Sequence, residues 1–344
     1  MVHPFAVSRK TALRPQLRHI VGCLALLTLL ATPAVTAHGA PPPASAATTT
    51  TGPTGPTPRV LQTDDNWGIY ITYFAAPGDR EVFTKEAPVV ILLHGDKQNR
   101  LVYEGPRGLA TRLQQEGCAV ITVDLRKHGQ STNVAQVGGD SAPTRSTEAS
   151  IQASDYRNMV EFDLEVVKRF IQQLHQAKKL NMRKLGIVAA GSSVGVAAAF
   201  ADADWNKEPY DDAPADDMKT PRGQDVRALV FLSPPARVKG LSLAESITDI
   251  RNPDWNIAFM TLYGKANRTD KKDAESLHKK LSGTSKTSAD RMYLVPVNVP
   301  SRGTDLLGIR DIDTEGAICK FFKKHLFDLR DSEWRDRQSR LVRK

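Results

Sequence analysis

A serine between two glycines is the residue of this chain best placed to do chemistry. Ser193 lies in the segment Gly191–Gly195 (GSSVG), directly after the apolar run 185–190 and before a stretch of small residues. A serine hydroxyl at a strand-to-helix turn attacks a carbonyl carbon only when a neighbouring base, normally histidine, takes its proton. The late segment 294–307, where that histidine is expected, contains none. The pattern predicts a nucleophile without an evident base.

Alternating strand and helix patterns would position this serine at one edge of a sheet. Short apolar runs predict strands over 67–73, 89–93, 119–123, 185–190, 228–232, 257–263 and 292–299. Apolar positions three and four apart predict helices over 105–116, 155–174, 270–281 and 314–327. Strands separated by helices favour a mostly parallel sheet covered on both faces. Ligands of such sheets bind outside the carboxyl ends of the strands.

Two further segments complete a resemblance to a known family. Residues 92–95 (LLHG) resemble a strand-end motif of the α/β-hydrolases, and residues 124–131 (DLRKHGQS) are similar to their Asp-x-Arg-Gly-x-Gly-x-Ser loop, with Lys127 in place of a glycine. Together with GSSVG, these motifs follow one another in the order of that superfamily. The resemblance covers about 61–327 and implies an α/β-hydrolase fold: a mostly parallel twisted sheet, helices on both faces, and little or no lid.

The same resemblance implies roles for individual residues. It puts Ser193 at the nucleophile position and makes an oxyanion hole from the backbone N–H groups of Asp96 and Val194. The acid of the catalytic triad is expected at Asn267, and Asp270, three residues later, can substitute if the loop reaches back. An asparagine cannot stabilise an imidazolium by charge.

The position of the triad histidine is equally altered. Thr304 stands near it, and neither Thr304 nor the neighbouring Arg302 accepts a proton at neutral pH. His94 and His128 match loop positions at which an imidazole bonds to backbone, so they are expected to be structural. The histidines of the helical stretches are expected on solvated faces (His175, His278) or in the terminal helix (His325).

Two functions remain open at this point. The chain is either a catalytically degenerate hydrolase fold that binds a ligand or partner, or an active serine ester or amide hydrolase with a rearranged acid and base. Expected partners are a small acyl- or ester-like ligand or another protein. Nucleic acid is not expected, because no stripe of interleaved basic and aromatic residues occurs.

The two ends of the chain differ in composition from the body. Residues 1–37 have basic residues, an apolar run and a small-residue cleavage site, which predict an export signal, and a retained anchor is the alternative. Residues 38–60, rich in Pro, Thr and Ala, predict a disordered spacer. Residues 328–344 predict a basic, solvated tail. These ends carry most of the formal net charge of +9. The signal pattern predicts an exported protein (periplasmic or secreted) without a stable membrane span after signal removal.

Cysteine and metal patterns predict little special chemistry. Cys118 and Cys319, the cysteines outside the signal, lie in apolar settings and are expected to be buried thiols, with a disulfide between them as the less favoured alternative. No zinc-ligand spacing occurs, and the acidic segment 202–225 lacks the regular spacing of a calcium loop. The sequence therefore predicts no metal and no cofactor.

Overall fold

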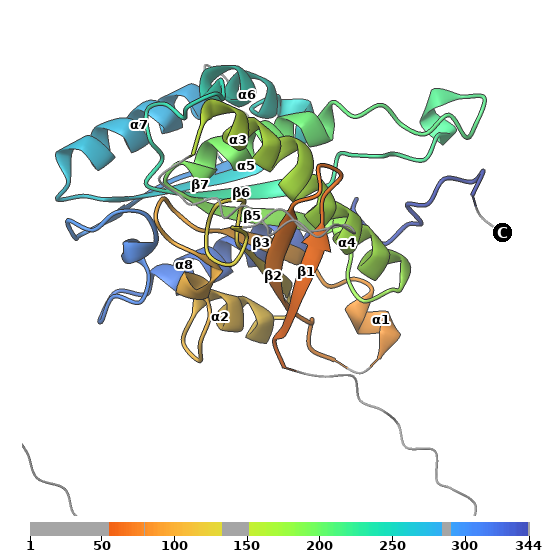
Figure 1. Ribbon diagram of the computed structural model, residues 1–344, viewed down its shortest axis with the longest axis horizontal. Coiled ribbons are helices and arrows are strands. Elements are labelled where there is room, and N and C mark those ends of the chain that lie inside the picture. The colour runs from red at the N-terminus through yellow and green to blue at the C-terminus, as the bar shows by residue number, and fades with distance from the viewer. Residues whose placement is uncertain (1–54, 79, 133–150, 284–289, 343–344) are drawn as a thin grey trace, which may run out of the picture. The chain divides into compact units, whose positions relative to one another are not determined.

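A mixed sheet organises the part of the chain that this computed structural model describes, residues 55–78, 80–132, 151–283 and 290–342 (Figure 1). Its eight strands in these residues have the order β1-β2-β4-β3-β5-β6-β7-β8. β1 pairs antiparallel with β2 and β2 with β4, and all the other neighbours are parallel. The strands are β1 (Thr57–Gln62), β2 (Gly68–Phe74), β3 (Val89–Leu93), β4 (Ala119–Val123), β5 (Leu185–Ala190), β6 (Val226–Leu232), β7 (Ala258–Gly264) and β8 (Met292–Val297).

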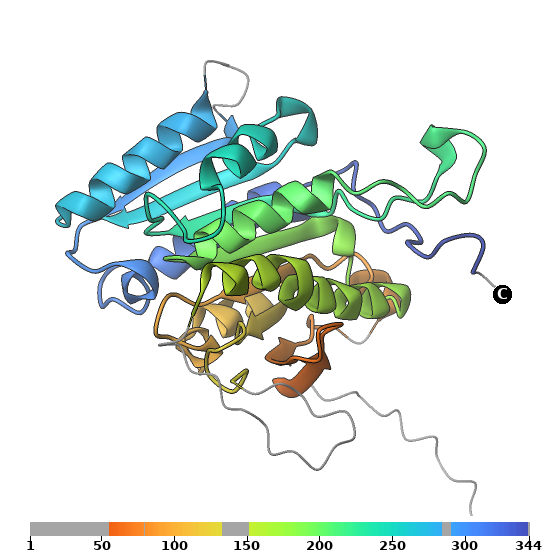
Figure 2. The ribbon, with the colours of Figure 1, turned by 45° about the horizontal axis from the view of Figure 1, so that its top comes forward.

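Helices cover both faces of this sheet (Figures 1 and 2). One face carries α3 (Ala153–Asn158), the π-helix η3 (Met159–Asp163), α4 (Leu164–Gln176), α5 (Ser193–Trp205), α6 (Leu243–Ile250) and α7 (Arg268–Ser282). The other carries α2 (Leu109–Gln115), α8 (Thr314–Phe322) and the π-helix η9 (Lys323–Phe327). Short helices are α1 (Glu81–Thr84), η1 (Arg100–Tyr103), η4 (Met182–Lys184), η5 (Asp216–Met218), η6 (Pro253–Trp255) and η8 (Gly303–Leu306). Within the described residues, no helix has the length and apolar character needed to cross a membrane.

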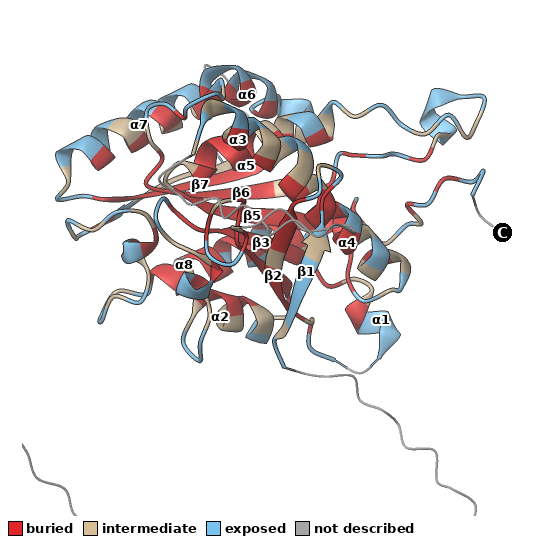
Figure 3. Ribbon diagram, in the orientation of Figure 1, coloured by how far each residue is buried: buried red, intermediate tan, exposed pale blue. Residues whose placement is uncertain are grey.

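The central strands are apolar throughout because both of their faces are buried (Figure 3). Successive side chains of a strand point to opposite faces. In β3, Val89, Ile91 and Leu93 belong to the core under α4 and α5, whereas Val90 and Leu92 belong to the core under α2 and α8. The predicted sheet with helices on both faces is confirmed.

Two element boundaries differ from those predicted. β1 starts at Thr57, inside the segment 38–60 that was expected to be a spacer, because Thr57 and the next residues pair with β2. The single helix expected over 155–174 is instead α3, the π-turn η3 and α4. Asp163 of that π-turn accepts hydrogen bonds from the backbone N–H (2.9 Å) and guanidinium (2.7 Å) of buried Arg126. The predicted signal, 1–37, lies outside the described residues.

The C-terminal segment 328–342 packs against the domain, which corrects its prediction as a solvated tail. Asn181 donates its side-chain N–H to the carbonyl oxygen of Ser332 (2.8 Å). The indole of Trp334 stacks on the ring of His175, with centroids 4.9 Å apart. His175, expected on a solvated helix face, is therefore fully buried.

A buried group of four charges anchors this segment, and we call Lys168, Asp204, Asp225 and Arg337 the Arg337 cluster. Both carboxylates are 0% exposed and Arg337 is 5% exposed. Arg337 donates to Asp225 Oδ1 at 2.5 Å, and Lys168 lies 3.1 Å from Asp225 Oδ2 and also contacts Asp204. Two acids face two bases, so the cluster is neutral, and each buried charge has the partner that it needs.

Cys118 and Cys319 are buried in the core beneath α2 and α8, and both are free thiols. Burial raises the pKa of both, and that of Cys319 to about 11. The expectation of buried thiols is met, and the less favoured disulfide is not formed.

Candidate functional site

Loops that follow five strands meet at the carboxyl edge of the sheet. The predicted site residues and their neighbours follow β3 (His94 to Asp96), β5 (Gly191 to Ser193), β6 (Ser233), β7 (Asn267 and Asp270) and β8 (Arg302 to Thr304). Hydrogen bonds join these loops directly: Ser233 Oγ donates to Asp270, and Gly303 N donates to Ser233 Oγ. This edge is where a parallel sheet binds its ligands.

The turn from β5 into α5 has its left-handed residue at Gly191, not at Ser193. Gly191 has φ +54°, whereas Ser192 is right-handed helical and Ser193 is the first residue of α5. A serine nucleophile of this fold sits on the strained residue of the turn itself. Because β5 ends at Ala190, the residue at the tip is Gly191, two positions before the serine that the GSSVG spacing indicated.

Ser193 is turned into the protein. It is 5% exposed, and its hydroxyl donates a 2.6 Å hydrogen bond to the backbone oxygen of His94. That bond joins the turn after β5 to the end of β3. The structure thus corrects the predicted position of Ser193, whose hydroxyl does not lie exposed at the tip.

The two backbone N–H groups predicted for an oxyanion hole, those of Asp96 and Val194, lie differently about the tip. A Cβ added at Gly191 would lie 3.8 Å from the backbone N of Asp96, so that group borders the tip. The N–H of Val194 instead donates to Gly191 O (3.1 Å) within the turn. The N–H that follows the tip belongs to Ser192, and it points to Asp96 Oδ2 at 3.4 Å.

A carboxylate occupies the space beside the tip. Asp96 Oδ2 accepts a hydrogen bond from Ser192 Oγ (3.0 Å) and would lie 3.1 Å from a Cβ added at Gly191. The hydroxyl of Tyr156 is 3.5 Å from Asp96 Oδ1. A carboxylate group therefore lies directly beside the tip of the turn. Nothing in the motif spacing signalled this contact.

The acid position holds a helix cap followed by a buried carboxylate. Asn267 caps α7 by accepting the backbone N–H of Asp270 at 3.1 Å. Asp270 is 0% exposed, and its Oδ2 accepts from Ser233 Oγ (2.8 Å) and Gly264 N (2.7 Å). Its Oδ1 lies 3.4 Å from Nε of Arg302. Asp270 does reach the loop after β8, and the side chain that it meets there is an arginine.

Thr304, near the predicted position of the triad histidine, contacts Gln98. Its hydroxyl donates to Gln98 Oε1 at 2.6 Å, and the same oxygen accepts the backbone N–H of Gly95 at 3.1 Å. The loop after β8 is thereby tied to the loop after β3. Thr304 is buried, and its hydrogen bond to Gln98 connects the two loops.

His94 and His128 hold the loop after β4, as expected for structural histidines. The Nδ1 atom of His94 lies 2.9 Å from Gly95 O, and its Nε2 accepts the N–H of Leu125 at 3.3 Å. His128 Nδ1 lies 3.0 Å from Arg126 O, and the two rings are 4.6 Å apart. Burial, followed by the neighbouring His128 ring, lowers the pKa of His94 to about 4.

His325 and His278 have partners away from the turn after β5. His325 Nε2 lies 3.0 Å from the hydroxyl of Tyr293, and burial together with Lys324 lowers the pKa of His325 to about 4. The Nε2 atom of His278, in α7, lies 3.4 Å from Ser282 Oγ.

Lys127 lies in the loop after β4, at the position where the resembled loop has a glycine. Lys127 has φ +66°, the left-handed conformation for which glycine is usual. Its ammonium group lies 2.8 Å from Asp155 Oδ2. Asp124, at the start of the loop, accepts the backbone N–H groups of Arg100 (2.7 Å) and Gln130 (2.9 Å).

The acidic segment 202–225 begins in the last turn of α5, has two buried carboxylates that belong to the Arg337 cluster (Asp204 and Asp225), and is otherwise mostly a surface loop. Asp212 accepts the backbone N–H groups of Thr220 and Arg340, each at 2.9 Å. Those hydrogen bonds lower the pKa of Asp212 to about 2. No group of three or more metal-ligating side chains occurs in the part of the chain that the structure describes.

Comparison with known proteins identifies the fold. No family model and no curated sequence matches the chain. Among solved structures, the Pyrococcus furiosus esterase Pf2001 superposes with a TM-score of 0.53 at 13% identity, over 79% of this chain and 92% of the esterase. The esterase Est1E of Butyrivibrio proteoclasticus superposes with a TM-score of 0.50 at 11% identity, over 77% and 96%. The chain has the α/β-hydrolase fold, and likeness at this level of identity defines the fold alone.

Proposed function

We propose that this α/β-hydrolase-fold protein binds a ligand or a partner and does not turn over esters. The observation that carries the proposal is Gly191. It occupies the left-handed tip of the turn after β5 and has no side chain that could serve as a nucleophile. The hydroxyl of Ser193 is already bonded to His94 O and is buried.

The charges around the tip support the same proposal. Acyl transfer builds a negative charge on the carbonyl oxygen, which hydrolases of this fold stabilise with backbone N–H groups. The Asp96 carboxylate beside Gly191 opposes that charge and engages the Ser192 hydroxyl. Arg302, the residue that meets Asp270, stays protonated and cannot act as a general base.

The expected ligand is a small acyl- or ester-like molecule, or a protein partner, at the carboxyl edge. We also propose that the protein is exported, on the evidence of the basic and apolar composition of 1–37. N-terminal sequencing of the exported protein is expected to return a start near His38. A start at Met1 would contradict cleavage and favour a retained anchor.

One contact favours the alternative of an active hydrolase with rearranged groups. The Ser192 hydroxyl donates to the Asp96 carboxylate at 3.0 Å, and a carboxylate can accept the proton of an attacking hydroxyl. In this alternative, Ser192 is the nucleophile one residue after the tip.

A fluorophosphonate probe, which labels activated serines, separates the two functions. With the full chain we expect no labelling above that of the heat-denatured protein and no hydrolysis of p-nitrophenyl acetate above background. Labelling that Ser192→Ala abolishes would establish the alternative. Labelling that Ser193→Ala abolishes while Ser192→Ala retains it would refute the assignment of the tip to Gly191. Circular dichroism of each variant shows that it is folded.

A further inference from the structure

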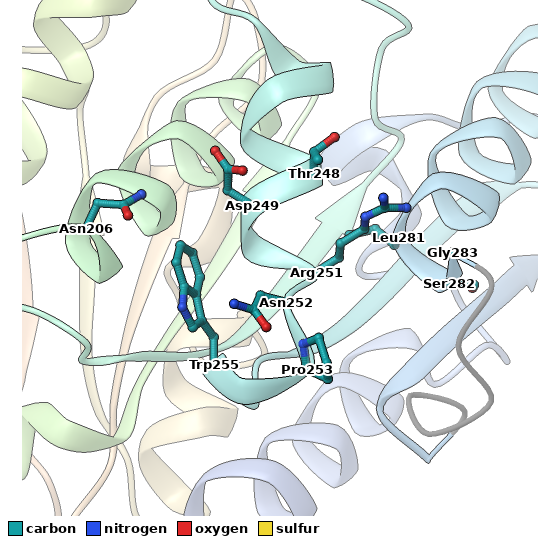
Figure 4. Close-up of a pocket in the computed structure, with 10 residues that line it drawn as sticks. All are labelled: Asn206, Thr248, Asp249, Arg251, Asn252, Pro253, Trp255, Leu281, Ser282 and Gly283. Carbon is teal, nitrogen blue, oxygen red and sulfur yellow. The ribbon is translucent and has the colours of Figure 1, made fainter.

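A cavity of about 540 Å³ lies away from the carboxyl edge (Figure 4). We call it the Trp255 pocket, after the indole that lines it together with Asn206, Asp249, Arg251 and Asn252. Asn206 directly follows α5, and η6 (Pro253–Trp255) ends three residues before the start of β7, so the pocket belongs to the amino edge of the sheet. None of the residues in the proposed function lines it.

The indole of Trp255 is a rigid wall of this pocket. It stacks on Trp205 with ring centroids 5.3 Å apart and planes 12° from parallel. Trp205 is itself fixed, because its Nε1–H donates to Val226 O at 2.8 Å and the guanidinium of Arg227 lies 5.0 Å over its ring. A ligand would therefore meet one face of an aromatic ring whose position is already set.

Hydrogen-bond donors and acceptors both surround the indole. The Asn252 Oδ1 accepts the backbone N–H of Asp254 (3.1 Å), which leaves its amide hydrogens for a ligand. The Asn206 amide nitrogen donates to Asp202 Oδ1 (2.7 Å), which leaves its oxygen as an acceptor. In Figure 4, Asn206 and Asn252 lie on either side of the indole, and the Asp249 carboxylate lies above it.

One acid and one base balance the charge of the pocket. Asp249 supplies acceptors, and Arg251 supplies donors while its Nη1 is held by Lys280 O at 3.2 Å. The pocket therefore has no net charge that would attract a charged ligand. A purely apolar ligand would leave these polar groups unpaired, which costs free energy.

We propose that the Trp255 pocket binds a neutral saccharide. A pyranose ring has an apolar C–H face that can pack on the indole, and its rim of hydroxyls both donates and accepts hydrogen bonds. Carboxylate, guanidinium and amide groups provide matching partners for adjacent hydroxyls. The volume falls within the range of roughly 300–1,000 Å³ that is usual for small-ligand sites, and it accommodates one or two sugar rings.

The test follows the tryptophan indole N–H signals of the full chain by NMR during titration with glucose, galactose, cellobiose and maltose. We expect at least one of these sugars to shift the Trp255 signal saturably, with a Kd on the order of 1 mM. The signals of Trp67 and Trp334, which do not line the pocket, should stay in place. Trp334→Phe, the matched control, should bind as the parent does.

Two variants decide the assignment. Trp255→Ala should abolish sugar binding, and Asp249→Asn, at an exposed position, should weaken it by about tenfold because a bond to a charged group is lost. If Trp255→Ala does not fold, Asp249→Asn and Asn252→Ala carry the test. The proposal is overturned if no sugar shifts the Trp255 signal, if binding survives these changes, or if adenosine shifts that signal while the sugars do not.

Discussion

Removal of Arg337 tests whether the C-terminal segment is an integral part of the domain. Arg337→Ala leaves the two buried carboxylates of the Arg337 cluster with Lys168 alone, so one buried negative charge has no partner. Breaking a buried ion pair in this way costs about 3–5 kcal/mol. Lys168 still contacts Asp225, so we expect the lower end, about 3 kcal/mol. For a domain of this size that corresponds to a fall in Tm of roughly 6–12 °C.

The assay is urea unfolding followed by tryptophan fluorescence, with Arg335→Ala as the matched control. Arg335 lies two residues away and is exposed, and none of the ion pairs among the described residues includes it. Its removal changes the net charge equally but should alter the unfolding free energy by less than about 0.5 kcal/mol. Adding Asp225→Asn to Arg337→Ala should recover part of the loss. Equal, small losses for the two arginine variants would refute the docking of this segment.

Three further predictions concern pH and the turn after β5. Since the pKa of His325 in the folded protein is about 4 and the ordinary value is 6.5, the unfolded chain takes up protons first as the pH falls. The unfolding free energy should therefore drop between about pH 7 and pH 5, and His325→Gln should remove on the order of 1–2 kcal/mol of that drop. The measurement is urea unfolding at several pH values. An unfolding free energy that depends on pH equally in parent and variant would contradict this prediction. Gly191→Ser should lower the unfolding free energy by about 1–2 kcal/mol, because a side chain is strained in the left-handed region, and it should add no esterase activity without a base. Thr304→His with Asn267→Asp should also remain inactive unless Gly191→Ser is added, and activity of that pair alone would mean that Ser193 is the nucleophile after all.

The sequence predicted the sheet well for a physical reason. Strands buried on both faces read as unbroken apolar runs, and β3, β4 and β5 begin and end at the predicted residues. The π-turn η3 was missed because a single inserted residue hardly disturbs helical periodicity. The docking of 328–342 was missed because the partner of Arg337 is Asp225, more than a hundred residues earlier, and the composition of a segment says nothing about such a contact.

The candidate site was harder to predict because its geometry depends on one backbone angle. A five-residue motif with two serines allows more than one residue at the tip, and the left-handed φ at Gly191 selects among them. The predicted end of β5 at Ala190 was the available signal, since the tip directly follows the strand. The contact between Asp96 and Ser192 joins loops nearly a hundred residues apart, and no local pattern marks it.

The glycine at the tip also bears on how stability and chemistry compete in this fold. A hydrolase that holds a serine in the left-handed region stores strain there, of order 1–3 kcal/mol, as part of presenting its nucleophile. Gly191 adopts φ +54° without that penalty, because it has no Cβ. Under the proposed function, the turn that is strained in hydrolases of this fold is unstrained in this protein. This turn then gains stability where it gives up reactivity, which is the usual relation between stability and activity in proteins.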